Sequence, residues 1–177
     1  GLEGADGPVR AMVDWDPDGP GPLGLHVVAG GTFRTFGLQT ETPVGVWPVA
    51  RSTGGMLPDL AGLTDDVFAL VVTPNNELIA GGAFPGGIAR WTGTSWSVVG
   101  GGVNGRCTSL ATTPGGVLIA GGVFTQAGGT AASNVATWNG TTWNNLGGGI
   151  AGPVYSVAGI AGEVVVAGGD FGDIAGQ

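Results

Sequence analysis

Three carboxylates at alternate positions are the strongest candidates for metal chemistry in this chain. They belong to Asp14, Asp16 and Asp18 of the segment DWDPDG, which ends in Gly19. Acidic residues in this spacing open the calcium loops of helix–loop–helix proteins, but the twelfth position of such a loop should be Glu and is Leu25 here. Two interpretations stay open: calcium bound by the three aspartates, or a turn that is acidic because Asp favours turns.

Few other residues could support catalysis. The chain has one cysteine, Cys107, and one histidine, His26, so it can form no internal disulfide and lacks the usual ligands of a zinc site. Cys107 stands where other copies of the repeat described below have valine, which predicts a buried apolar residue. His26 stands where another copy has Glu77, which predicts a half-exposed strand residue without a catalytic role. With no nucleophile elbow and no phosphate-binding loop, the sequence predicts a protein that is not an enzyme.

Four tryptophans form two pairs with the same spacing. They are Trp91 with Trp96, and Trp138 with Trp143. Indole rings stack on sugars, so these four residues are the candidates for a carbohydrate site. Their recurrence is equally what packing between repeats requires, and we favour packing. The segment NGT at 139–141 also matches the acceptor motif for N-glycosylation at Asn139, although a hairpin turn explains it as well.

Composition and charge restrict the classes of partner. Acidic side chains number 13 against five basic ones, and the net charge of −8 opposes binding to nucleic acid or to an anionic membrane surface. No apolar run reaches the roughly 20 residues that cross a bilayer. The chain has 39 glycines, and turn formers and β-branched residues abound while helix formers are scarce. We therefore predict an all-β fold in an extracellular or cell-surface protein.

A repeated segment organises the chain. The sequence LIAGGAF at 78–84 returns as LIAGGVF at 118–124, with related copies at 27–33 and 165–171. A second block precedes each copy, and its aligned positions are Val9, Val67, Cys107 and Val154. These positions are 58, 40 and 47 residues apart, and self-similarity at such intervals is typical of repeat architectures. The repeats span approximately residues 4–61, 62–102, 103–149 and, incompletely, 150–177.

Each repeat offers four short apolar runs separated by turn signals, most clearly in NVATWNGTTWNNLGGG at 134–149. Four strands per unit form one blade of a β-propeller. Residues 1–177 are therefore predicted to be a single domain of β-propeller-type repeats, with four-stranded antiparallel blades and about three and a half repeats. A two-residue turn at Asn139-Gly140 would place Trp138 and Trp143 diagonally on one face. The segment DWDPDG falls in an insertion between the first two strands of the first repeat.

These motifs together resemble the secreted bacterial kelch-like β-propeller repeats, with their AGGxF, NxAxWNGxxW and LGxG segments. Such repeats are similar to the central domain of galactose oxidase and to fungal cortical marker propellers. The resemblance implies a propeller fold but no particular activity. In the galactose oxidase relatives, two Tyr and two His form the copper site. This chain has only Tyr155 and His26, so oxidase chemistry is not expected.

The function predicted from these features is that of a non-enzymatic extracellular repeat protein with a structural, adhesive or self-assembling role. An unfinished blade exposes a strand edge, and such an edge is a template for pairing. The expected partners are therefore homotypic strand or blade contacts, in a homo-oligomer or filament, or the remainder of a longer chain. Two alternatives stay open: a carbohydrate-binding, lectin-like propeller, and a non-catalytic fragment of a larger secreted enzyme.

Overall fold

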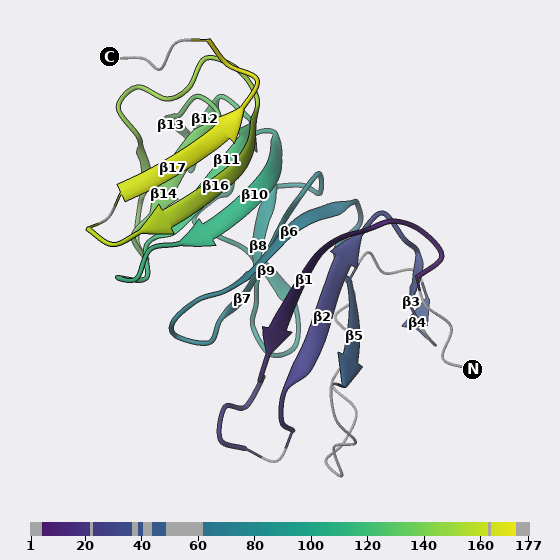
Figure 1. The fold of residues 1–177 in the computed structure, drawn as a ribbon. Helices are drawn as coiled ribbons and strands as arrows, with labels where there is room; N and C mark the ends of the chain where they lie inside the picture. The colour runs from purple at the N-terminus through teal and green to yellow at the C-terminus, as the bar shows by residue number, and fades with distance from the viewer. Residues whose placement is uncertain are drawn as a thin grey trace.

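The computed structural model describes residues 5–21, 23–36, 39–40, 44–48, 62–162 and 164–172. No helix occurs in these residues, and the strands pair in antiparallel sheets (Figure 1), which confirms the prediction of an all-β fold. Valine, isoleucine and alanine fill the strands, while glycine, proline and asparagine occupy many of the turns between them. This distribution follows from the fit of β-branched residues to a pleated surface and of turn formers to tight loops.

Four main sheets follow the order of the repeats. Sheet 1 contains β1 (Val9–Trp15), β2 (His26–Gly31) and β5 (Val44–Pro48). Sheet 2 contains β6 (Val67–Val72), β7 (Leu78–Gly82), β8 (Ile88–Trp91) and β9 (Trp96–Val98). Sheet 3 contains β10 (Arg106–Thr112), β11 (Leu118–Val123), β14 (Val135–Trp138) and β15 (Trp143–Asn145). Sheet 4 contains β16 (Val154–Ile160) and β17 (Val164–Gly169).

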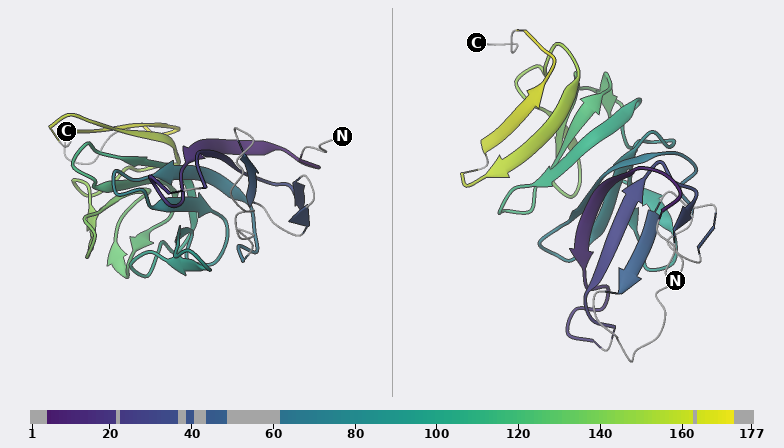
Figure 2. Two further views of the ribbon diagram at one scale, coloured as in Figure 1. Left: turned by 90° about the horizontal axis from the view of Figure 1, so that it is seen from below. Right: turned by 45° about the vertical axis from the view of Figure 1, so that its right-hand side comes forward.

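Two short ribbons accompany the main sheets. They are β3 (Thr35–Phe36) with β4 (Gln39–Thr40), and β12 (Gln126–Ala127) with β13 (Thr130–Ala131). The main sheets follow one another in space in sequence order, with sheets 1 and 4 at opposite ends (Figures 1 and 2). Sheets 2 and 3 have the predicted four strands, whereas sheets 1 and 4 have three and two among the described residues, which form no closed ring.

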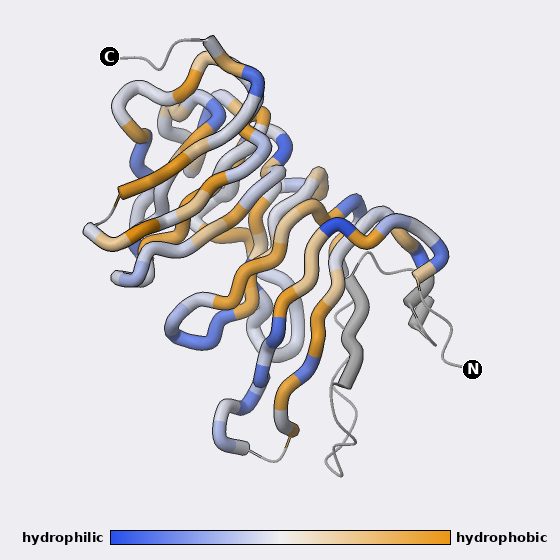
Figure 3. Tube along the Cα trace, in the orientation of Figure 1, coloured by the Kyte–Doolittle hydropathy of each residue, from blue (hydrophilic) through white to orange (hydrophobic). Residues whose placement is uncertain are grey.

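The first strands of neighbouring sheets lie side by side and form three junctions. Strand β1 contacts β6 at junction 1–2, β6 contacts β10 at junction 2–3, and β10 contacts β16 at junction 3–4. The hydrophobic core is divided into clusters that span these junctions. Figure 3 shows the hydrophobic residues concentrated along the strands, while the loops are mainly hydrophilic. The repeats are therefore held together chiefly by burial between consecutive sheets.

The first strand of every sheet carries the same irregularity. Its pairing with the second strand shifts by one residue directly after the aligned positions of the repeat. Those aligned positions are Val9, Val67, Cys107 and Val154, which pair with Gly31, Gly82, Gly122 and Gly169. An extra residue on one strand is a β-bulge, which bends the strand and increases its twist. Residues that align between the repeats in the sequence therefore also occupy equivalent positions in the four sheets.

In the first three AGG segments the other glycine receives side chains from the neighbouring sheet. A Cβ atom placed at Gly30 would lie 2.5 Å from Cγ1 of Val67, and one at Gly81 would lie 2.8 Å from Sγ of Cys107. At the third junction the same atom at Gly121 would lie 2.6 Å from Cγ1 of Val157. We call this glycine with the space above it the glycine socket. Each buried valine- or leucine-sized side chain that fills it stabilises the junction by about 2 kcal/mol.

The loop that joins β14 and β15, the last two strands of sheet 3, is longer than the sequence predicted. Trp138 pairs directly with Trp143, so residues 139–142 form a four-residue loop, and the prediction of a two-residue Asn139-Gly140 turn is wrong. The reason is the Asn139 side chain, whose Oδ1 accepts hydrogen bonds from the backbone N–H groups of Thr141 and Thr142, each 2.9 Å long. The two indoles therefore lie opposite each other rather than diagonally, with ring centroids 5.5 Å apart.

Candidate functional site

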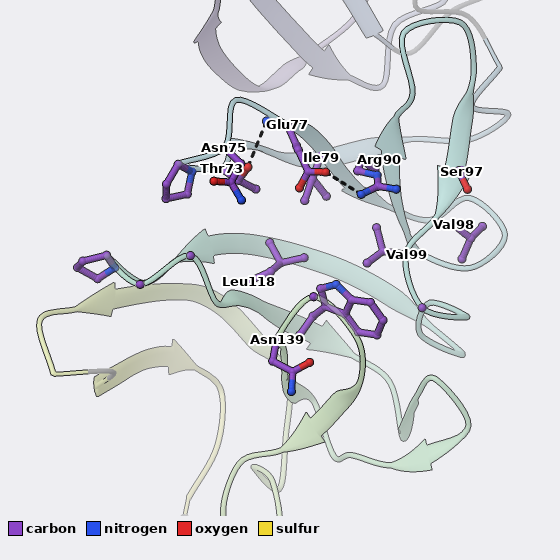
Figure 4. Close-up of a pocket in the computed structure, with 17 residues that line it drawn as sticks. Thr73, Asn75, Glu77, Ile79, Arg90, Ser97, Val98, Val99, Leu118 and Asn139 are labelled. Atoms are coloured by element: carbon purple, nitrogen blue, oxygen red, sulfur yellow. Dashed lines mark hydrogen bonds and ion pairs between the residues drawn. The ribbon is translucent and has the colours of Figure 1, made fainter.

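A groove of about 560 Å³ lies at junction 2–3 (Figure 4). Sheet 2 supplies one wall from the β6–β7 loop and strands β7 to β9, including Thr73, Glu77 and Arg90. Sheet 3 supplies the other wall from the β10–β11 loop, strand β11 and the β14–β15 hairpin, including Trp138 and Asn139. This inter-sheet groove is therefore built from loops and strands that sheets 2 and 3 have in common.

Two matching loops form one end of the groove. The loop after β6 begins at Thr73, whose Oγ1 accepts the N–H of Glu77 at 3.1 Å, and the loop after β10 begins at Thr113, whose Oγ1 accepts the N–H of Val117 at 3.2 Å. Both threonines are buried. The fourth loop residue has positive φ in each case, 63° at Asn76 and 87° at Gly116, which Asn and Gly tolerate best. The Thr-Pro segments of the repeat thus fix both loops locally.

One ion pair supplies the formal charges of the groove. Arg90 Nη1 donates to Glu77 Oε1 at 2.6 Å, and the two side chains are 49% and 38% exposed. An exposed pair of this kind stabilises the fold by at most about 1 kcal/mol. Among the described lining residues no others carry a formal charge. The groove therefore presents hydrogen-bonding groups without a net charge.

The structure separates the four tryptophans proposed as ligand-stacking residues. Trp91 and Trp143 are buried, and Trp143 Nε1 donates to the Val99 carbonyl of sheet 2 at 3.0 Å. Trp96 and Trp138 are half-buried. Trp138 lines the groove and lies over Gly100, where an added Cβ atom would come within 2.8 Å of ring atom Cε3. Of the four, Trp138 is the residue that the structure brings to the groove wall together with Glu77, Arg90 and Asn139.

Among the described residues of junction 1–2, Trp15 fills the place that Thr73 takes at junction 2–3. The β-bulge register aligns Trp15 with Thr73, and the buried Trp15 indole belongs to the same hydrophobic cluster as Val28, Leu78 and Trp91. Trp15 Nε1 donates to the Asn76 carbonyl at 3.1 Å. Sequence reasoning missed this residue, although a signal was present. Tryptophan stands in one repeat where the next two have threonine.

The three aspartates of DWDPDG lie around the end of β1. Asp14 is an exposed residue of the strand, Asp16 follows it, and Asp18 Oδ2 accepts the N–H of Leu23 at 3.2 Å. Gly19 has a φ of 63°, as a tight turn requires. In the part of the chain that the structure describes, no three acidic, His or Cys side chains gather as a metal-binding group. Calcium at Asp14, Asp16 and Asp18 stays a prediction.

The lone histidine and the lone cysteine are both buried. His26 is 4% exposed and its Nδ1–H donates to the Gly24 carbonyl at 2.8 Å, so the prediction of a half-exposed residue is wrong. The Gly24 contact satisfies the ring locally, which lets a polar side chain take a buried strand position. The prediction of a buried Cys107 is confirmed. Burial raises the pKa of its thiol to about 12, against a smaller opposing effect of a backbone hydrogen bond with Ser109.

No family model matches the chain, and no curated protein sequence matches it either. Within the described residues, no helix has the length and apolar character needed to cross a lipid bilayer.

Proposed function

We propose that this chain is a non-enzymatic, extracellular β-propeller-type repeat protein that assembles with copies of itself. The bulged first strands, which lie side by side, support a propeller-like succession of blades. The acidic composition supports an extracellular setting. A single observation carries the assembly proposal: the interface that repeats at each junction has an unfilled half on sheet 4 and a matching exposed half on sheet 1.

The unfilled half is the glycine socket of sheet 4. Gly168 aligns with Gly30, Gly81 and Gly121, yet an added Cβ atom there would meet no atom of the described residues within 4 Å. Strand β17 is also less covered than its counterparts, since every residue of β7 is buried whereas Val164 and Val166 of β17 are exposed. Among the described strands β17 pairs with β16 alone, so its other backbone edge can accept a further strand.

The matching half is the outer side of β1. Val67 and Leu70, which fill the socket of sheet 1, are buried. Their counterparts at the start of β1 are Val9 and Met12, and these are 42% and 67% exposed. Two apolar side chains that are core residues in every later repeat therefore lie at the surface of the first one.

These two surfaces fit a head-to-tail contact between copies. In it, Val9 and Met12 of one molecule would enter the socket at Gly168 of another, as Val67 and Leu70 enter the socket at Gly30. Such a contact is heterologous, because it joins two different patches. A heterologous contact builds a ring if its rotation closes and a filament if it does not. Either product suits a structural or adhesive role.

Sedimentation velocity over a range of concentrations tests the proposal on the full chain. We expect concentration-dependent association of the wild type, weakened at least tenfold by Gly168→Val or by Met12→Glu, since each would remove or block a contact at the centre of the interface. Gly172→Val and Val123→Glu are the matched controls, because Gly172 also has open space around it and Val123 is also an exposed apolar residue.

The controls should associate as the wild type does, and all four variants should keep its melting temperature within a few degrees. A wild type that stays monomeric at all concentrations would overturn the proposal. Association that all four substitutions leave unchanged would overturn it too.

A further inference from the structure

We propose that the inter-sheet groove at junction 2–3 binds a neutral carbohydrate, with one pyranose ring against Trp138. This goes beyond the proposed assembly, because the groove lies between sheets 2 and 3, away from both Val9 and Gly168. A volume of about 560 Å³ lies in the range of small-ligand sites and accommodates one or two sugar rings.

The indole supplies the apolar part of the site. Trp138 is half-buried, and one side of its ring lies against Gly100 while the ring of Trp143 is inclined at 46° to it. These contacts hold the ring in place without covering it fully. The C–H groups on one face of a pyranose carry partial positive charge and are attracted to the negative face of an aromatic ring. A fixed, half-exposed indole is therefore suited to a sugar.

Polar groups of three kinds line the sheet 2 wall of the groove, across from this ring. Arg90 can donate hydrogen bonds, Glu77 can accept them, and the exposed hydroxyl of Ser97 can do both (Figure 4). A pyranose bears hydroxyl groups that both donate and accept, so such a mixed set can donate to some of them and accept from others. The Arg90–Glu77 contact fixes these two side chains relative to each other before a ligand binds.

Charge decides between a neutral sugar and an ionic ligand. Arg90 and Glu77 neutralise each other at 2.6 Å, so neither is left to attract an isolated charge. The net charge of −8 further disfavours an anionic ligand such as a phosphate or a sulfated glycan. A neutral polyhydroxylated ligand is the class that gains contacts here without breaking an ion pair.

Among the described residues, junction 1–2 is filled where junction 2–3 is open. At junction 1–2 the buried Trp15 indole packs in one cluster with Leu78 and Trp91, the counterparts of Leu118 and Trp138 in the groove. Thr73 takes the register of Trp15 at junction 2–3 and leaves that space open. Of the two tryptophan pairs, the proposal thus assigns a sugar site to Trp138 with Trp143 and none to Trp91 with Trp96.

The test is a titration of the full chain followed by the indole N–H signals in ¹H–¹⁵N NMR spectra. The probes are cellotriose, chitotriose, galactobiose and mannobiose. Trp138→Phe assigns the signal of Trp138 by its loss. We expect at least one probe to shift this signal saturably, with a dissociation constant on the order of 1 mM, while the signal of the buried Trp15 stays in place.

A pair of threonine-to-tryptophan substitutions provides the control. Thr73→Trp would place an indole where junction 1–2 has one, and should weaken binding at least tenfold. Thr130→Trp adds an indole at an exposed threonine that does not line the groove, so it should bind as the wild type does. The proposal is overturned if no probe shifts the Trp138 signal at about 20 mM, or if Thr73→Trp, folded by the same spectra, binds like Thr130→Trp.

Discussion

Junctions 1–2 and 2–3 share one framework and differ in what fills it. In both, the first strand of one sheet packs into the glycine socket of the sheet before it, and the bulge follows the same aligned position. At junction 1–2 a buried Trp15 closes the space beside the β6–β7 loop, whereas at junction 2–3 the smaller Thr73 leaves a groove. The size of one side chain next to this loop therefore determines whether the space between two sheets is filled by hydrophobic core or left as a groove.

Removing Trp15 should show the largest difference between the junctions. Trp15→Ala would leave a cavity beside Leu78 and Trp91 and lower the free energy of unfolding by about 4 kcal/mol. Trp138→Ala should cost about half as much, because Trp138 is already half-exposed. Urea denaturation of both variants measures the two losses. Equal losses would contradict the view that Trp15 is a core residue and Trp138 a groove residue.

The glycine sockets give the next largest effect. Gly81→Ala would place a methyl group 2.8 Å from Cys107 Sγ and 3.1 Å from Leu110 Cδ1, so we expect a loss of about 2 kcal/mol in the free energy of unfolding. Gly168→Ala, the same change in the unfilled socket, should stay within about 0.5 kcal/mol. Denaturation should be followed at protein concentrations that keep both variants monomeric. A tolerated Gly81→Ala would refute the close packing at junction 2–3.

Cys107 should make the stability of junction 2–3 sensitive to alkaline pH, because its thiol can ionise. The corresponding residue at junction 1–2 is Val67, which cannot ionise. Burial raises the pKa of the folded thiol to about 12 from an ordinary value near 9, so the unfolded state ionises first. Its contribution to stability is complete below pH 9 and falls by about 1.4 kcal/mol per pH unit between pH 9 and pH 12. Cys107→Val should remove this decline from the melting profile. The same alkaline slope in Cys107→Val would assign it to other groups.

The Glu77–Arg90 ion pair should give the smallest effect. Glu77→Gln keeps the shape of the side chain and removes its charge, and the exposed pair stabilises the fold by at most about 1 kcal/mol. Thermal melting with and without 1 M sodium chloride checks this, since wild type and variant should converge at high salt. A loss above about 2 kcal/mol would mean that the pair supports the groove wall structurally.

Much of the fold follows from the sequence because its determinants are local and repeated. The AGG segments, the aligned Val9, Val67, Cys107 and Val154, and the turn formers between them predict the all-β repeats. The hairpin loop was predicted incorrectly because the Asn139 side chain caps a four-residue loop instead of a two-residue turn. The burial of His26 depends on a contact with Gly24 that no alternation pattern shows.

The candidate site could be predicted only in part. Trp138 was named from its spacing, but all four paired tryptophans looked equivalent in the sequence. Their different exposure depends on the neighbouring sheet, where Trp15 covers one junction and Thr73 leaves the next one open. The unfilled socket at Gly168 is likewise a property of packing between sheets, since the four AGG segments have the same three residues.

Disulfide capture between two single-cysteine variants tests the assembly most directly. Both carry Cys107→Val, and one adds Val9→Cys while the other adds Gly168→Cys. The design copies the geometry of junction 2–3, where Cys107 Sγ lies 2.8 Å from a Cβ atom placed at Gly81. In a disulfide, the Cβ atom of one cysteine lies about 3 Å from the Sγ atom of the other. Gly81→Cys beside the native Cys107 is the intramolecular control.

After mild oxidation of the mixed variants, non-reducing electrophoresis should show a cross-linked pair that contains one copy of each, well above the homotypic products. If the control closes its disulfide while the mixture yields no heterotypic pair, the head-to-tail contact through Val9 and Gly168 does not form, and the proposed assembly is contradicted.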